Sequence, residues 1–378
     1  MPKSLVFVGS PGPDAPAQLA ALAAAGVTPR RLRPEEGLAG LAADPPVALV
    51  VDAGVPELAG FMAALREQPA LAPLPVVAWI KDPDSGLLDR AFAAGVDDYL
   101  PGGAAHQFDA LLTAVTAADP WKAVRAPAGR VLLAHGDRLE RVRFGAVLRR
   151  NGFDPHFAAA AGELVGAVGL VRPRALVATA ELVSGSAMSI AGLRTDEGEP
   201  LPLVLVARRE EIDATRDGLG DRPLARILDS AADAESLTFL LNELLSPAPP
   251  NVRRTPRLLY HTPIRFRPVD HAGPAAHGYT FNVNLNGLFL RTLAPLPLQT
   301  RLELSFRPPH GRGNVILLAQ VMWRKEFADA RGAATPPGMG VQFLESWIAD
   351  EMGYEAGYRQ LAEESGEGLV TIPAPPAI

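Results

Sequence analysis

Short apolar runs alternate with helical segments over the first two thirds of the chain. Runs such as "PVALVVD" (46–52) and "LPVVAWI" (74–80) are bounded by proline, glycine or charge. This is typical of strands that are covered on both faces in a parallel sheet. The segments "APAQLAALAAAG" (15–26) and "RLERVRFGAVLRRNG" (138–152) end at a glycine, as capped helices do. The alternation predicts doubly wound, flavodoxin-like α/β folding.

The pattern occurs twice, at an offset of 127 residues. "PVALVVD" returns as "PRALVAT" (173–179), and "LPVVAWI" returns as "LPLVLVA" (201–207). A fixed internal period identifies duplicated units. We therefore predict two α/β domains, over residues 1–118 and 129–246, followed by the proline-rich linker "SPAPPN".

After this linker the pattern changes to short alternating strands. "PIRFRP", "YTFNV", "RLELSFR" and "GMGVQFLE" are typical of an antiparallel barrel. We predict a third domain over residues 251–364, in which a helix over 347–364 follows the strands. Four side chains of this helical segment are expected to cap the barrel: Trp347, Met352, Tyr354 and Leu361.

Composition narrows the class of protein. The 378 residues are 48% apolar and 21% charged, which predicts a globular chain with more than one domain. The absence of cysteine excludes disulfides and thiolate zinc sites, and fits a reducing, cytoplasmic compartment. The net charge of −6 divides into −8 before residue 251 and +2 after it. The acidic charge of residues 1–250 argues against binding to nucleic acid. The chain has no run of about 18 apolar residues, so we predict no membrane insertion.

The order and lengths of the elements in both α/β copies resemble those of response-regulator receiver domains. Asp52 stands where receivers carry the phosphoacceptor, with Pro56 four and Gly60 eight residues further on. Phosphoryl transfer to an aspartate requires Mg²⁺ held by carboxylates after strand one, a Ser/Thr on strand four and a Lys on strand five.

Neither copy carries this set. In the first copy the acid pair, hydroxyl and lysine positions hold Gly9 and Ser10, Ile80, and Gly102. In the second copy the acid pair, phosphoacceptor and hydroxyl positions hold His135 and Gly136, Thr179, and Ala207. The resemblance therefore implies degenerate receivers that are not phosphorylated, that dock partner proteins and that have helix faces able to support a homodimer.

Two motifs of the third domain suggest a ligand site. "RRTPR" places Arg253, Arg254 and Arg257 directly after the linker, and "NVNLNG" holds Asn282, Asn284 and Gly287. Asn286-Gly287 predicts a two-residue hairpin turn. These two motifs resemble the signature of the PilZ domain, a bacterial receptor module for cyclic di-GMP, which is an R-x-x-x-R loop before a D/N-x-S-x-x-G strand. The resemblance spans the whole domain.

The resemblance implies a set of ligand-binding residues: Arg253, Arg254, Arg257, Asn282, Asn284 and Gly287. Guanidinium groups match both phosphate and guanine geometry, a carboxamide can bond a base edge, and Gly287 would let the backbone approach a ligand closely. Asn284 stands where the family has serine, which is expected to weaken binding about tenfold.

A catalytic interpretation finds little support. The seven histidines are scattered without a zinc-binding motif, and His271, His277 and His310 are expected in exposed loops. We predict no catalysis, no cofactor and no metal. Two hypotheses remain: an effector that binds cyclic di-GMP and relays it to protein partners, or a ligand-independent adaptor with a vestigial site in motility, polarity or polysaccharide regulation.

Overall fold

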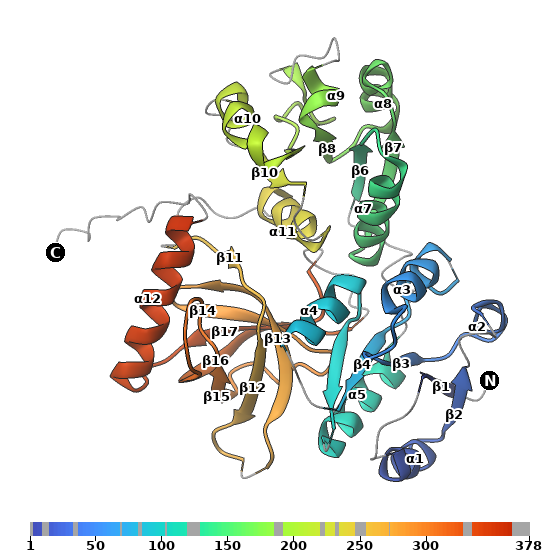
Figure 1. Ribbon diagram of the computed structural model, residues 1–378, viewed down its shortest axis with the longest axis vertical. Helices are drawn as coiled ribbons and strands as arrows, with labels where there is room; N and C mark the ends of the chain where they lie inside the picture. The colour runs from blue at the N-terminus through green and yellow to red at the C-terminus, as the bar shows by residue number, and fades with distance from the viewer. Residues whose placement is uncertain are drawn as a thin grey trace.

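The chain forms two α/β units and one β-barrel with a helix (Figure 1). The computed structural model describes these residues: 3–9, 15–32, 37–68, 70–81, 85–102, 104–118, 129–184, 192–219, 224–230, 234–245, 255–271, 273–327 and 335–364. We propose the predicted boundaries 1–118, 129–246 and 251–364 for three domains.

The first unit is a parallel sheet in the order β2-β1-β3-β4-β5. Its strands are β1 (Lys3–Val8), β2 (Val27–Leu32), β3 (Ala48–Asp52), β4 (Val76–Ile80) and β5 (Asp98–Pro101). Its helices are α1 (Ala15–Ala24), α2 (Ala39–Ala43), α3 (Leu58–Glu67), α4 (Ser85–Ala94) and α5 (Ala105–Ala117). β4 is buried along its whole length, because helices cover both faces of the sheet.

The second unit repeats the arrangement, with the parallel order β7-β6-β8-β9-β10. Its strands are β6 (Gly129–Ala134), β7 (Phe153–Ala158), β8 (Ala175–Thr179), β9 (Leu203–Ala207) and β10 (Ala225–Asp229). Its helices are α7 (Arg138–Arg150), α8 (Leu164–Val171), α9 (Ala180–Ser184), α10 (Ile212–Leu219) and α11 (Ala234–Leu245).

Both units therefore have the 2-1-3-4-5 order of receiver-like, flavodoxin-like folds, and the predicted fold class is confirmed. The glycine caps are present as well. Gly26 after α1 has φ +66° and Gly152 after α7 has φ +84°, a backbone conformation that other residues adopt at a cost.

The barrel closes through strand β13. The antiparallel order is β11-β13-β12-β15-β16-β17-β14, and β14 also pairs with β13, which completes the ring. The strands are β11 (Leu258–Leu259), β12 (Pro263–Pro268), β13 (Ala276–Asn284), β14 (Gly287–Arg291), β15 (Arg301–Phe306), β16 (Val315–Lys325) and β17 (Gly338–Phe343). Buried residues alternate with more accessible ones along β12 and β15, because one face of each strand lines the barrel core.

Helix α12 (Ile348–Glu364) packs along the barrel (Figure 1). Tyr354 and Tyr358 are buried, and Leu361 packs against the same cluster. The expectation that Trp347 and Met352 also cap the barrel is wrong, because they are 77% and 65% exposed. Met352 lies two residues before Tyr354, about 200° around the helix, and Trp347 precedes the helix. Among the described helices, none is both long and apolar enough to cross a bilayer.

The hairpin between β13 and β14 differs from the predicted one. Asn284 pairs with Gly287, so the two loop residues are Leu285 and Asn286, and Gly287 is already in the strand. None of these residues has a positive φ. The Asn-Gly signal identified the hairpin but placed its turn one residue too late.

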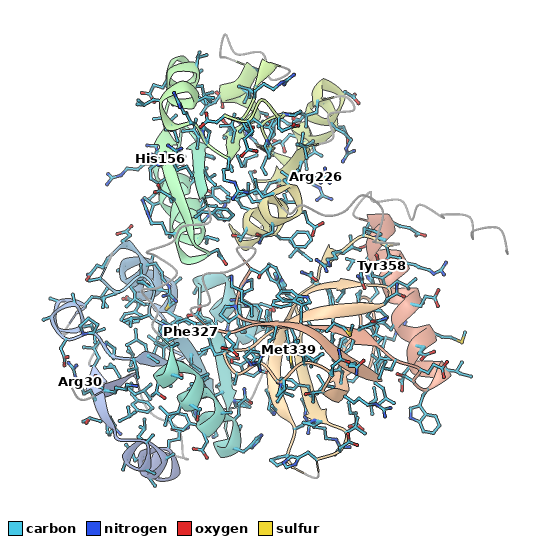
Figure 2. All side chains as sticks on the ribbon, turned by 180° about the vertical axis from the view of Figure 1, so that it is seen from behind. Arg30, His156, Arg226, Phe327, Met339 and Tyr358 are labelled. Carbon is cyan, nitrogen blue, oxygen red and sulfur yellow. The ribbon has the colours of Figure 1, made fainter. Side chains whose placement is uncertain are left out.

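The first unit packs tightly against the barrel through α4 and β13. The ring of Phe92 stacks on that of Tyr279, with centroids 4.0 Å apart and planes within 5°, and the Tyr279 hydroxyl donates to Asp89. The buried Arg291 places its Cζ 4.6 Å from the centroid of the Phe92 ring and donates to the Val96 carbonyl at 3.1 Å. Phe327 also packs against the first unit (Figure 2). The hydrogen bonds of Tyr279 and Arg291 join residues 190 and 195 positions apart in the chain.

Two ionisable groups lie in this interface. Burial raises the pKa of Asp98 to about 7, although its carboxylate accepts hydrogen bonds from Leu293 N at 2.7 Å and from the Thr292 hydroxyl at 3.1 Å. Burial lowers the pKa of His277 to about 4. His277 belongs to β13 and is half-buried, so its prediction as an exposed loop residue is wrong. Gln107 fixes the backbone at this position, since its side chain donates to the His277 carbonyl and accepts from the His277 N–H, both at 2.9 Å.

Candidate functional site

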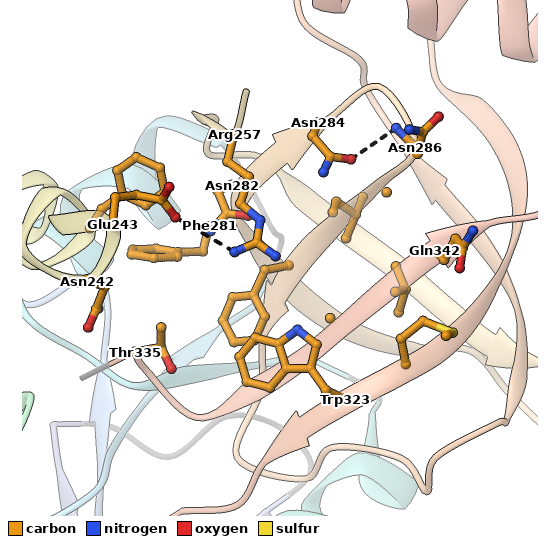
Figure 3. A pocket seen from close by; sticks show the side chains of 17 residues that line it. Asn242, Glu243, Arg257, Phe281, Asn282, Asn284, Asn286, Trp323, Thr335 and Gln342 are labelled. Atoms are coloured by element: carbon orange, nitrogen blue, oxygen red, sulfur yellow. Dashed lines mark hydrogen bonds and ion pairs between the residues drawn. The ribbon is translucent and has the colours of Figure 1, made fainter. Parts of the chain in front are cut away.

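A cavity of about 450 Å³ opens between the barrel and helix α11 of the second unit (Figure 3). Its barrel walls come from the segment before β11 and from β13, β14, β16 and β17. The lining residues are Phe239, Asn242, Glu243, Arg257, Phe281, Asn282, Asn284, Asn286, Gly287, Leu288, Phe289, Met322, Trp323, Thr335, Gly340, Val341 and Gln342.

A β-bulge shapes the β13 wall. The pairing of β13 with β14 shifts between Thr280 and Asn282, so Phe281 is an extra residue without a partner on β14. Such a bulge bends the strand and redirects its side chains. Phe281, Asn282 and Asn284 all line the cavity, and Asn282 is only 8% exposed. The bulge therefore brings an aromatic ring and two carboxamides to one wall.

Asn284 is held in place by the hairpin turn. Its side-chain Oδ1 accepts a hydrogen bond from Asn286 N at 3.0 Å (Figure 3), the geometry of an Asx turn. Its carbonyl accepts from the Tyr354 hydroxyl at 2.7 Å, and burial raises the pKa of Tyr354 well above its usual value. The hydrogen bond from Asn286 N fixes the carboxamide of Asn284 at its oxygen, and the side chain lines the cavity.

Arg257 supplies the positive charge at the cavity. Its Nη1 lies 3.8 Å from Oε1 of Glu243 on α11, and the two side chains are 32% and 27% exposed. The preceding residue, Pro256, is anchored because its carbonyl accepts from the Tyr358 hydroxyl at 2.7 Å. Arg253 and Arg254 lie outside the described residues.

Gly287 is required by the barrel itself. A Cβ at this position would lie 2.1 Å from the Val341 carbonyl oxygen of β17, a backbone atom that cannot give way. The expected close approach therefore involves the neighbouring strand, although Gly287 also lines the cavity. Gly340 plays the same part for a side chain, since its Cβ would lie 2.1 Å from Nε1 of Trp323.

Four aromatic rings form a continuous series beneath the cavity. Phe239 meets Phe281 edge to face with centroids 6.1 Å apart, and Phe281 meets Phe289 in the same way at 6.0 Å. Phe289 stacks on Trp323 at 5.0 Å, with planes within 13°. Trp323 is 37% exposed, so one end of the series reaches the surface. Planar apolar surface beside a cation and carboxamides suits a planar, anionic ligand.

Residues 251–352 match the family model described as PilZ domain. The barrel is a PilZ domain. No curated protein matches the chain.

Solved structures similar to parts of the chain include YcgR of Escherichia coli in complex with c-di-GMP, at 19% identity, with 31% of this chain and 48% of that chain covered and a TM-score of 0.25. The inhibitor of motility MotI/DgrA of Bacillus subtilis has 15% identity, 31% and 56% coverage and a TM-score of 0.24. The chain thus spans about half the length of these two. A putative two-component system response regulator/GGDEF domain protein has 18% identity, 65% and 100% coverage and a TM-score of 0.30.

The α11 side of the PilZ cavity was not predicted. Phe239, Asn242 and Glu243 come from the second α/β unit, and the sequence relates them to the PilZ motifs only through their spacing of three and four residues, which places them on one helix face. Trp323 and Phe289 were also missed, because their sequence context does not distinguish them from other apolar residues of the barrel strands.

Among the described residues, the receiver-like site of the first unit lacks the groups for phosphoryl transfer. Asp52 ends β3, and its Oδ1 accepts from Gly54 N at 2.8 Å. Gly9 packs on it, with a Cβ position 3.0 Å from the Asp52 Cβ. Ile80 is buried, and Gly102 lies against the Lys81 carbonyl. In the described part of the chain, no cluster of three or more His, Asp or Glu side chains is arranged to hold a metal ion.

Proposed function

We propose that the chain is a non-catalytic signalling effector whose PilZ domain binds cyclic di-GMP in the cavity beside α11. The observation that carries the proposal is the meeting of Arg257, Asn282 and Asn284 around one cavity in a domain of this family. Its volume of about 450 Å³ falls within the usual range for ligand sites.

Each group has a chemical part in this proposal. The Arg257 guanidinium would pair with a phosphate or with guanine O6 and N7, for which its planar fork is suited. The carboxamides of Asn282 and Asn284 would bond base edges. Gly287 keeps the hairpin wall close to β17. Arg253 and Arg254 are proposed to complete the basic segment, and guanine would lie against the aromatic series that ends at Trp323.

Strand β13 supports a relay from the cavity to the first unit. Tyr279 stacks on Phe92 of α4, and two residues further along the same strand Phe281 lines the cavity. A ligand that shifts the β13 bulge would therefore act on the contact with the first unit. We propose that the receiver-like units pass this change to protein partners in the cytoplasm, either as a monomer or as a homodimer.

The test is a calorimetric titration of the full chain with cyclic di-GMP, compared with Arg257→Ala. A charge-assisted contact is worth about 1.5–3 kcal/mol, so loss of Arg257 should weaken binding roughly 10- to 140-fold. Arg267→Ala is the matched control. Arg267 lies on the same barrel in an exposed ion pair with Glu303 at 2.9 Å, outside the cavity, and its loss should leave the affinity unchanged. No heat from the native chain would refute the proposal and favour a ligand-independent adaptor.

A further inference from the structure

Helix α11 has two packed faces that belong to different parts of the molecule. Leu237, Leu241 and Leu244 are buried in the core of the second α/β unit. Phe239 is buried in the aromatic cluster with Phe281 and Phe289 of the PilZ domain. Because one helix joins both cores, any ligand that moves α11 away from the barrel must move the second unit with it.

The charged end of α11 faces the arginine that the proposed ligand needs. Glu243 follows Phe239 by one helical turn, and its carboxylate lies 3.8 Å from the Arg257 guanidinium, as the dashed line in Figure 3 shows. About a third of each side chain is exposed, so water and ligand can reach the pair. The ion pair therefore holds Arg257 against α11 and neutralises it in the absence of ligand.

A phosphate in the cavity would compete with this carboxylate. Arg257 is the one cationic side chain among the described residues that line the cavity, and Glu243 would repel a dianionic ligand placed beside it. The phosphate and the Glu243 carboxylate would thus compete for the same guanidinium. The apolar contacts of α11, among them the edge-to-face contact of Phe239 with Phe281, would then hold α11 on the barrel without this ion pair.

We propose that the Glu243–Arg257 ion pair is a latch that keeps the second α/β unit on the PilZ domain, and that binding of a dianionic cyclic dinucleotide opens it. The inference rests on the proposed function. The ligand would exchange the carboxylate for a phosphate on Arg257, and the second unit would leave the barrel while the first unit stays bound through Phe92 and Tyr279.

A different role for Glu243 predicts the opposite result. A carboxylate can accept hydrogen bonds from the N1–H and N2–H₂ groups of guanine, so Glu243 could read the base and strengthen binding. The sign of the change in affinity on Glu243→Gln separates the two roles, because glutamine keeps the shape of the side chain and removes its charge.

The experiment is a titration of the full-length Glu243→Gln variant with cyclic di-GMP, together with hydrogen exchange of α11 in the absence of ligand. Loss of one partly exposed ion pair should tighten binding about two- to fivefold and should speed exchange in α11. Glu303→Gln is the control, since it removes the same kind of ion pair, at a more exposed place on the barrel away from the cavity.

Unchanged or weaker binding by Glu243→Gln, with a native chain that does bind, would overturn the latch and leave the proposed function intact. No heat from either protein would overturn the proposed function and the latch with it. Unchanged exchange in α11 of the ligand-free variant would also overturn the latch, whatever the affinity.

Discussion

Replacing Phe92 by alanine should uncouple the first α/β unit from the PilZ domain. Phe92 is 3% exposed and Tyr279 is 1% exposed, and their stacked rings are the centre of the contact between α4 and β13. The same ring lies beneath the Arg291 guanidinium at 4.6 Å. The variant therefore leaves a cavity on the side of the first unit and an unsupported tyrosine and arginine on the side of the barrel.

The magnitude follows from the burial. Truncation of a buried phenylalanine to alanine costs about 3–5 kcal/mol. At about 2–4 °C per kcal/mol for a cooperative unit of this size, Tm should fall by roughly 6–20 °C. Because part of the loss falls on the contact itself, calorimetric scans should resolve the barrel from the first unit as separate transitions, while the native chain unfolds them together.

The control is Leu65→Ala. Leu65 of α3 is fully buried in the first unit, and its truncation costs about 2–5 kcal/mol without removing the Phe92–Tyr279 stack. It should lower the Tm of the joint transition without dividing it. A single transition shared by both units in Phe92→Ala would refute the reasoning.

Two further variants test the barrel and the interface. Gly287→Ala would place its Cβ 2.1 Å from the Val341 carbonyl oxygen and should destabilise the barrel by about 2 kcal/mol or more. Gly353→Ala is the control, because its Cβ would lie 3.7 Å from the nearest side chain and should not destabilise the barrel. Equal Tm values for the two variants would contradict this. Burial, followed by Arg265 and His106, lowers the pKa of His277 to about 4, so the unfolded chain takes up the proton first and stability is lost as pH falls from about 6.5 to about 4. His277→Gln should lose less stability than the native chain over this pH range, as measured by denaturant titrations. Asp98, whose raised pKa acts in the opposite direction, is present in both proteins and does not affect the comparison. Equal pH dependence of the two stabilities would show that His277 is not the cause.

The parallel sheets were predictable because strands such as β4 are apolar at every position, and only a sheet covered on both faces explains that pattern. The barrel strands were predictable from alternation, as in β15. Features that depend on one helix meeting another element were predicted less well. Tyr354 and Leu361 pack on the barrel as expected, but Met352 lies on another face of α12 and Trp347 lies before the helix begins.

The PilZ motifs identified the barrel side of the cavity and not the side formed by α11. Asn282 and Asn284 line the cavity with Arg257. Glu243 and Phe239 reach it from another sheet, and no local pattern in α11 indicates that contact. His277 was misplaced for the same reason, since its burial depends on Gln107 and the rest of the first unit. Gly287 shows the converse, because the glycine signal was correct while its cause is the Val341 carbonyl across the barrel.

Hydrogen–deuterium exchange of the full-length chain with and without cyclic di-GMP tests the site most directly. We predict slower exchange in the backbone around the cavity, at residues 257–259, 281–289 and 339–342, together with faster exchange in α11. Exchange that is unchanged at these segments under saturating nucleotide, or protection confined to another part of the chain, would contradict this prediction.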